Sequence, residues 1–208
     1  MDLSFPLATI APTLDAGVLQ VLAATTAGCS AAEVHRRLGR GSDEGVRKVL
    51  ARLVHQGVVL VETPVRYPAY SLNRQHLAAP HIEGLSRLRA ELFDRIREEV
   101  SNWDVEPVHA GIFGSFARGT ATSDSDIDVL LVRPTRMGPA TEGTWLAQMD
   151  RLDRKIHSWT GNDAQIIDIA PATLSRLARE DDPLVDSWMT DQVHLFGERI
   201  MDLLRSAR

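Results

Sequence analysis

Residues 108–132 read VHAGIFGSFARGTATSDSDIDVLLV, and this stretch decides the fold of the second half of the chain. Its apolar start, residues 108–113, predicts a strand that leads into a tight turn at Gly114 and Ser115. Glycine suits this turn because it tolerates backbone angles that other residues resist. Ser115 then lies where a short helix begins, and the free N–H groups at such a beginning favour the binding of a phosphate.

A second strand is predicted from Asp126 to Val132, ten residues after the turn. Because side chains alternate along a strand, Asp126 and Asp128 point to one face while Ile127 and Val129 point to the other. Two carboxylates side by side repel each other, and a divalent cation between them would remove that repulsion. Carboxylates together with substrate phosphates are the usual ligands of Mg²⁺. The alternative without a function is a hairpin with an acidic rim.

The combination of Gly-Ser, a gap of ten residues and Asp-x-Asp in an apolar strand resembles the signature of the polymerase β-type nucleotidyltransferase superfamily. The surrounding residues 116–119, FARG, and 125–128, SDID, resemble those of its small members, the minimal nucleotidyltransferases. Either half of the motif alone would mean little, but together, between two apolar runs, they favour a functional site. The resemblance covers residues 103–208 and implies an α+β fold built on a mixed sheet.

The resemblance implies a catalytic and metal-binding site of three acids, Asp126, Asp128 and Asp168, which hold two Mg²⁺ ions. One ion bridges the triphosphate of an incoming nucleotide, ATP or another NTP, and the other prepares an acceptor hydroxyl. Asp168 matches the third acid of the family because it lies on a strand predicted at residues 165–170. A buried aspartate flanked by isoleucines needs a partner. A salt bridge to Arg118, or a contact with N–H groups, is the competing explanation for Asp168.

The resemblance also assigns the phosphates of the nucleotide to the turn. Gly114 and Ser115 are expected to hold the β- and γ-phosphates, and Arg118 is expected to add positive charge beside the leaving pyrophosphate. An exposed arginine without a ligand is the alternative for Arg118. No residue in the sequence stands out for recognition of the base.

The first third of the chain predicts three short helices followed by a β-hairpin. A capping-box pattern at Ser30 begins the second helix, and Ser42 caps the third. Gly57 ends the third helix. The predicted elements are helices at 14–24, 31–38 and from Ser42 to Gly57, and strands at 58–62 and 69–72.

This order of elements resembles a winged helix-turn-helix domain, in which the third helix enters the DNA major groove and the hairpin touches the backbone. The third helix carries basic side chains, with His55, away from its apolar stripe, and the hairpin carries one more at its tip. These expected DNA-binding residues are Arg47, Lys48, Arg52 and Arg66. The alternative is a solvated basic face on a domain used for dimer or protein contacts.

Charge is spread unevenly over the chain, which predicts two domains with different partners. Residues 1–75 hold eight Lys/Arg and six Asp/Glu, a net charge of +2, and residues 76–208 have a net charge of −7. We therefore expect a winged helix domain over 1–75, a connecting helix within 76–102 and a nucleotidyltransferase domain over 103–208. The connecting helix has an apolar stripe over residues 81–100, which either covers the transferase sheet or pairs with a second chain as a homodimer.

Composition is typical of a globular chain, with 44% hydrophobic and 25% charged residues among 208. No apolar run approaches the ~20 residues that a membrane span needs, and the first residues lack the features of a signal peptide. A single cysteine, Cys29, excludes an internal disulfide and fits a cytoplasmic protein. We expect Cys29 to be a buried structural residue.

The function expected from these features is Mg²⁺-dependent transfer of a nucleoside monophosphate, such as AMP from ATP, to an acceptor hydroxyl, coupled to DNA binding. Relatives modify small molecules, RNA ends or protein hydroxyls, and some minimal nucleotidyltransferases are antitoxins that modify a partner toxin. The added winged helix departs from those antitoxins and favours a regulatory role. The alternatives are a transcription regulator whose transferase fold senses nucleotide without catalysis, and an interaction scaffold.

Overall fold

The computed structural model describes residues 1–63, 67–180 and 182–206. The chain divides into two compact units, the first over residues 4–89 and the second from Ala90 onward. None of the helices within the described ranges combines the length and apolarity that crossing a membrane requires.

The first unit consists of five helices and one β-hairpin. The second predicted helix, 31–38, is confirmed, as is its cap, where Ser30 Oγ accepts a hydrogen bond from the N–H of Glu33. Ser42 Oγ accepts from the N–H of Gly45 at 3.0 Å and begins the third predicted helix. The elements are α1 (Pro6–Ile10), α2 (Leu14–Ala23), α3 (Ala31–Leu38), α4 (Asp43–His55), β1 (Val59–Glu62), β2 (Ala69–Leu72) and α5 (Ala79–Ser86).

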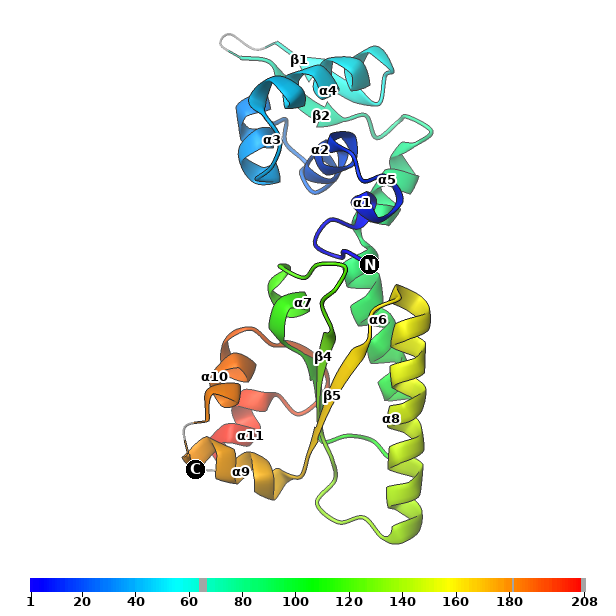
Figure 1. Cartoon of the computed structure of the whole chain (residues 1–208), viewed down its shortest axis with the longest axis vertical. Coiled ribbons are helices and arrows are strands. Elements are labelled where there is room, and N and C mark those ends of the chain that lie inside the picture. The colour runs from blue at the N-terminus through cyan, green and yellow to red at the C-terminus, as the bar shows by residue number, and fades with distance from the viewer. Residues whose placement is uncertain (64–66, 181, 207–208) are drawn as a thin grey trace. The chain divides into compact units, whose positions relative to one another are not determined.

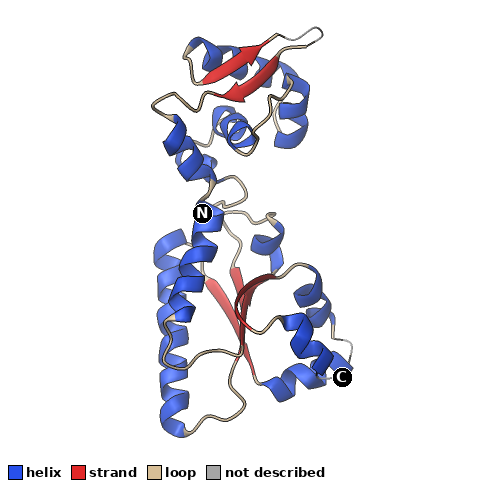
Figure 2. Ribbon diagram, turned by 180° about the vertical axis from the view of Figure 1, so that it is seen from behind, coloured by secondary structure: helices blue, strands red, loops and turns tan. Residues whose placement is uncertain are grey.

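The core of the first unit is formed by the apolar faces of its helices together with the hairpin (Figure 2). Val18, Val34 and Val46, from α2, α3 and α4, are completely buried. The hairpin strands pair antiparallel, with Val59 opposite Leu72. Cys29 is buried, as expected. In this unit the hairpin follows α4, and α5 comes after the hairpin and packs into the same core.

The prediction of a single connecting helix over residues 81–100 is wrong, because the structure has two helices there. Helix α5 ends at Ser86, Arg87 leaves the helical conformation, and α6 (Leu88–Ser101) follows. Gly84 and Ser86 favour helix less than the residues around them, which is consistent with the interruption. The apolar residues of α6, Leu92, Ile96 and Val100, are buried within the second unit, so this stripe is not free to pair with a second chain.

The second unit contains a four-stranded mixed sheet in the order β5-β4-β3-β6, which confirms the predicted α+β class. Strand β3 pairs antiparallel with both β4 and β6, whereas β4 and β5 are parallel. After α6, the elements are β3 (His109–Ile112), α7 (Gly114–Arg118), β4 (Ile127–Val132), α8 (Pro139–Thr160), β5 (Ala164–Ile169), α9 (Pro171–Arg179), α10 (Pro183–Thr190), β6 (Val193–Gly197) and α11 (Ile200–Ser206).

Helices cover both faces of this sheet (Figure 1). Helices α6 and α8 lie on one side, and α7, α9, α10 and α11 lie on the other. On the second side, Leu130 and Val132 of β4 pack with Leu174 of α9 and Trp188 of α10. The ring of Phe113 meets that of Trp188 edge to face, with centroids 6.2 Å apart. Central strand β4 is therefore buried on both faces, except near its first residues.

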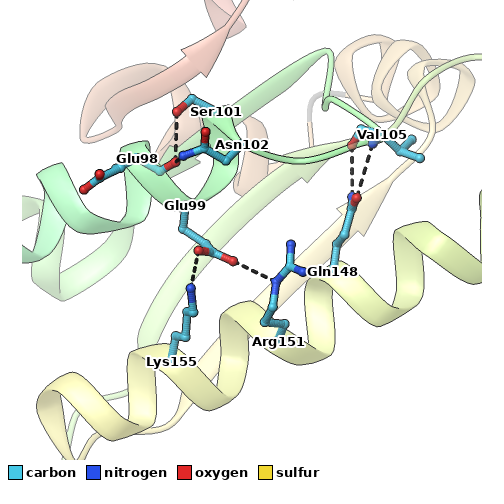
Figure 3. A network of polar contacts seen from close by, with 8 residues as sticks. All are labelled: Glu98, Glu99, Ser101, Asn102, Val105, Gln148, Arg151 and Lys155. Carbon is cyan, nitrogen blue, oxygen red and sulfur yellow. Dashed lines mark hydrogen bonds and ion pairs between the residues drawn. The ribbon is translucent and has the colours of Figure 1, made fainter.

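A polar network fastens α6 to α8 (Figure 3). The nearly buried carboxylate of Glu99 accepts hydrogen bonds from Arg151 Nε, at 2.9 Å, and from Lys155 Nζ. Burial opposes the charge of Glu99, but the two cations together lower its pKa. The side-chain amide of Gln148 bonds both the N–H and the carbonyl of Val105, at 3.2 and 3.1 Å. The network thus fixes the segment between α6 and β3 against α8.

Buried His109, on β3, predicts a dependence of stability on pH. Its Nδ1 lies 2.7 Å from the carbonyl oxygen of Glu198, and burial lowers the pKa of His109 from 6.5 to about 4. Because the unfolded chain then binds this proton at a higher pH than the folded chain, the free energy of unfolding falls as the pH decreases from 6.5 toward 4. The loss due to this residue reaches about 3 kcal/mol.

Chemical denaturation at a series of pH values between 4 and 7 measures this effect. His109→Gln should lower the stability at neutral pH but flatten its decline in acid. The exposed neighbour His194 supplies the matched control, because His194→Gln should retain most of the decline. If the stability of both variants falls with pH as steeply as that of the parent protein, a group other than His109 takes up the proton.

Candidate functional site

The predicted turn lies directly against an aspartate of the neighbouring strand. Gly114 has a φ of +69°, in the left-handed region that favours glycine, and it begins the five-residue helix α7. A Cβ atom at this position would overlap the carboxylate oxygen Oδ2 of Asp128. The absence of a side chain at Gly114 therefore permits both the turn and the close approach of Asp128. Ser115 follows in α7 and is half-buried.

The two acids of the Asp-x-Asp motif lie together at the start of β4. Asp126 is exposed and immediately precedes the strand, and Asp128 is half-buried within it. Ile127 and Val129 are completely buried, as the predicted alternation requires. Burial raises the pKa of Asp128, the charge of Asp126 raises it further, and the charge of Arg118 opposes both. The acids and Arg118 therefore act on one another electrostatically.

Arg118 has a partner that the sequence did not indicate. Its Nη1 donates to Oδ2 of Asp191, at 2.8 Å, where Asp191 follows the last turn of α10. Arg118 therefore does not form the salt bridge that was the competing explanation for Asp168. Asp191 is 73 residues away in the chain, and no spacing or motif connects the two positions.

The expected place of Asp168 in the catalytic and metal-binding site is corrected by the structure. Asp168 pairs in register with Leu131, and Asp128 pairs with Gln165. Since side chains alternate, Asp168 lies on the opposite face of the sheet from Asp128. Its charge is compensated there by Arg133, whose Nε donates to Oδ1 at 3.0 Å and whose Nη2 donates to Oδ2.

Helix α8 completes the surroundings of Asp168. Trp145 donates its indole N–H to Oδ2 of Asp168 at 3.1 Å, and Trp145 is itself completely buried. Arg133 is also 3.8 Å from the carboxylate of Glu142, near the start of α8. Asp168 therefore joins the ends of β4 and β5 to α8. This is a structural role of the type that the competing explanation anticipated, although with Arg133 as its partner.

Two carboxylates beside a turn with free N–H groups fit a magnesium ion that is shared with a nucleotide. Mg²⁺ is commonly bound by one or two protein carboxylates, substrate phosphates and water, so Asp126 and Asp128 supply a sufficient protein share. Within the described residues there is no group of three or more Asp, Glu, His or Cys side chains placed to hold a metal. The donors present therefore fit one ion with a nucleotide, and the third acid of the expected set is missing.

Three of the four basic residues expected to bind DNA are exposed but paired with acids of the same unit. Arg47 Nε lies 2.7 Å from Asp43, and Lys48 Nζ lies 2.6 Å from Glu44, both one turn earlier on α4. Arg52 forms an ion pair with Asp15 of α2. Arg66 lies outside the described residues. The positive charge of α4 is thus partly neutralised within the unit.

Comparison with known proteins finds a similarity in the part of the chain that carries the turn and the two acids. Residues 93–156 match the family model described as "Nucleotidyltransferase domain". No curated protein matches the chain. A crystal structure described as a toxin-antitoxin with AMP-PNP covers 55% of this chain and 82% of its own, with 16% identity and a TM-score of 0.36. A mutant of the toxin-antitoxin MntA-HpeT covers the same shares, with 13% identity and a TM-score of 0.37.

The matched stretch of the family model contains the whole of the local site. It includes the turn at Gly114, the helix with Arg118 and the acids Asp126 and Asp128, and it ends before β5. Neither Asp168 nor Gln165 is within it. Residues 93–156 are therefore similar to a nucleotidyltransferase domain.

Proposed function

We propose that the second unit transfers a nucleoside monophosphate from ATP or another NTP to an acceptor hydroxyl, with a divalent metal ion as cofactor. The observation that carries the proposal is the close approach of Gly114 to the carboxylate of Asp128, with Asp126 on the same side. This arrangement brings the backbone N–H groups at the beginning of α7 and two carboxylates to one place. A phosphate needs the N–H groups, and the cation that neutralises the phosphate needs the carboxylates.

The residues of the site divide into two roles. Asp126 and Asp128 would hold the magnesium ion, which when bound neutralises phosphate charge and polarises the reacting phosphoryl group. Gly114 and Ser115 would orient the β- and γ-phosphates through the first N–H groups of α7. Arg118 is exposed and close enough to Asp128 to influence its pKa, and the guanidinium N–H groups beyond the one bonded to Asp191 would contact the leaving pyrophosphate.

A second candidate function is nucleotide sensing without transfer. The observation that favours it is the position of Asp168, which Arg133 and Trp145 hold on the other face of the sheet. In the expected transfer mechanism, a third acid prepares the acceptor hydroxyl. That acid was expected to be Asp168, which does not lie beside Asp126 and Asp128. Binding of a nucleotide needs only the Gly114 turn, Asp126 and Asp128. All three are in place, so they would suffice for a sensor.

Incubation with radiolabelled ATP, Mg²⁺ and cell lysate distinguishes the two functions. Transfer predicts that label appears on a protein, an RNA or a small molecule, and that Asp128→Asn removes it. The class of labelled molecule would identify the acceptor, including a protein partner of the antitoxin type. If no NTP gives label while calorimetry detects Mg²⁺-dependent binding of nucleotide, the sensor is supported and transfer is not.

We further propose that the first unit binds DNA through α4. The support is the position of Arg47 and Lys48 on the exposed surface of this helix, where their side chains are 61% and 76% exposed. A phosphate can compete with Asp43 and Glu44 for these cations because exposed ion pairs contribute at most about 1 kcal/mol. Because phosphate contacts release counterions from the DNA, affinity should fall as the salt concentration rises, with a slope that reports the number of those contacts.

Combined replacement Arg47→Ala and Lys48→Ala should weaken DNA binding to a similar extent for all sequences. The slope of log K against log salt should fall by about 2, one for each lost phosphate contact. Gel shifts at several salt concentrations measure both quantities. The control removes two exposed arginines of the second unit, Arg154→Ala and Arg176→Ala, and should bind as the parent does. Unchanged affinity in the first double variant would exclude α4 as the DNA-binding element.

A further inference from the structure

We propose that this site binds one divalent cation with its nucleotide, and that Gln165 occupies the position where a third carboxylate would be needed for a second ion. The inference rests on the proposed nucleotide and metal binding at Asp126 and Asp128. It lowers the number of ions at that site from the two expected from the sequence to one.

The position of Gln165 follows from the pairing of β4 with β5. The two strands are parallel, and Asp128 and Gln165 are direct partners in the register. Partner residues on neighbouring strands project to the same face, and the strands lie about 4.8 Å apart. Gln165 is exposed, whereas every other residue of β5 is at least half-buried. Its side chain is therefore the one on β5 that lies beside Asp128 and remains available to a ligand.

Asp168 is too far along the strand, and on the wrong face, to replace Gln165. Three residues separate the positions, which corresponds to about 10 Å along the strand. An odd number of residues also reverses the face. Arg133 and Trp145 hold the carboxylate of Asp168 on the side of α8. A shift of β5 by three residues would be required to exchange the two side chains.

The other acids around the site already have partners. Asp163 comes just before β5, but Nδ1 of His157 on α8 lies 3.0 Å from its Oδ1. Asp191 accepts from Arg118. Within the described residues no third metal-binding side chain joins Asp126 and Asp128. The described acids thus provide two negative charges at the site.

The number of protein carboxylates then limits the number of ions. Two divalent cations in a phosphate-transferring site lie about 3.5–4 Å apart, and each is held by anionic ligands. A glutamine amide can offer a neutral oxygen to a cation, but it adds no negative charge. With Gln165 beside Asp128, the two carboxylates suffice for one cation shared with the triphosphate and leave a second cation without a protein carboxylate of its own.

Electron paramagnetic resonance of Mn²⁺ in the presence of a non-hydrolysable ATP analogue tests this directly. The parent protein should show bound, magnetically isolated Mn²⁺, without the spin coupling of a close pair. Gln165→Asp should introduce that coupling and bind the second ion at least about tenfold more tightly than the parent does. The control is Ser158→Asp, at an exposed position of α8. It adds the same charge to the second unit and should leave the spectrum as in the parent.

The outcomes separate this inference from the function on which it rests. A coupled pair of ions in the parent protein would overturn the one-ion site and leave nucleotide and metal binding intact. A Gln165→Asp variant that folds and binds one ion, but never shows coupling, would also overturn it. If the parent binds no Mn²⁺ even with the nucleotide analogue, the metal role of Asp126 and Asp128 fails, and the inference fails with it.

Discussion

Asp128→Asn is expected to reduce metal-dependent transfer of nucleotide by at least about a hundredfold, because it removes one of the two anionic ligands of the cation. Asp128 is the half-buried member of the pair and lies against the turn at Gly114. The substitution keeps the shape of the side chain and removes a charge that burial and Asp126 both disfavour. We therefore expect the free energy of unfolding to stay equal or to increase while the activity falls.

Measurement of the rate of label transfer, together with denaturant unfolding, checks both halves of this expectation. The matched control is Asp153→Asn, which removes an exposed acid from α8 and should change neither quantity. A variant at Asp128 that retains the parent's rate would exclude this carboxylate from metal binding. A variant that loses both activity and stability would indicate that the acid has a structural role.

Gly114→Ala is expected to have the second large effect, on both stability and nucleotide binding. The backbone at this position has a φ of +69°, which costs a residue with a side chain about 1–2 kcal/mol. The added methyl group would also overlap Oδ2 of Asp128 and displace the carboxylate. We expect unfolding to become easier by at least that amount and the affinity for Mg²⁺-nucleotide to fall by more than about tenfold.

The chain offers a matched control for this substitution. Gly143→Ala lies within α8, has an ordinary helical backbone and meets no atom within 4 Å, so it should stabilise the protein slightly. In an Asp128→Ala background the overlap is absent, and Gly114→Ala should then cost only the backbone strain. If the cost is the same in both backgrounds, the contact between Gly114 and Asp128 does not matter for the site.

The sequence was most informative where a local rule determines the structure. Ser30 and Ser42 cap their helices because a serine hydroxyl satisfies a free N–H group within the same turn. The alternation of Asp126, Ile127, Asp128 and Val129 follows from the geometry of one strand. The Gly114 turn required a backbone that glycine favours. These features could be predicted because their partners are a few residues away.

The role of Asp168 could not be predicted in this way. Alternation gives the face of Asp168 relative to its own strand, whereas its relation to Asp128 depends on the register between β4 and β5. A register with Asp168 opposite Asp128 would have produced the expected site, and the sequence does not distinguish the two. The partners Arg133 and Trp145 also lie on other elements, at 35 and 23 residues from Asp168.

The contact between Arg118 and Asp191 was missed for the same reason. It depends on how α10 packs beside the turn, through apolar contacts such as that of Phe113 with Trp188. The interruption between α5 and α6 is a different case. The apolar spacing continues across it, so the stripe predicted one helix, although Gly84 and Ser86 weaken the helix at that point.

We propose above that the Gly114 turn, Asp126 and Asp128 form one binding site for a metal ion and a nucleotide. Calorimetric titration of the whole chain with ATP, first in Mg²⁺ and then in EDTA, tests this site. Binding should require Mg²⁺ and should be lost in the double variant Asp126→Asn and Asp128→Asn. ATP binding of equal strength in EDTA, or undiminished binding by the double variant, would contradict it.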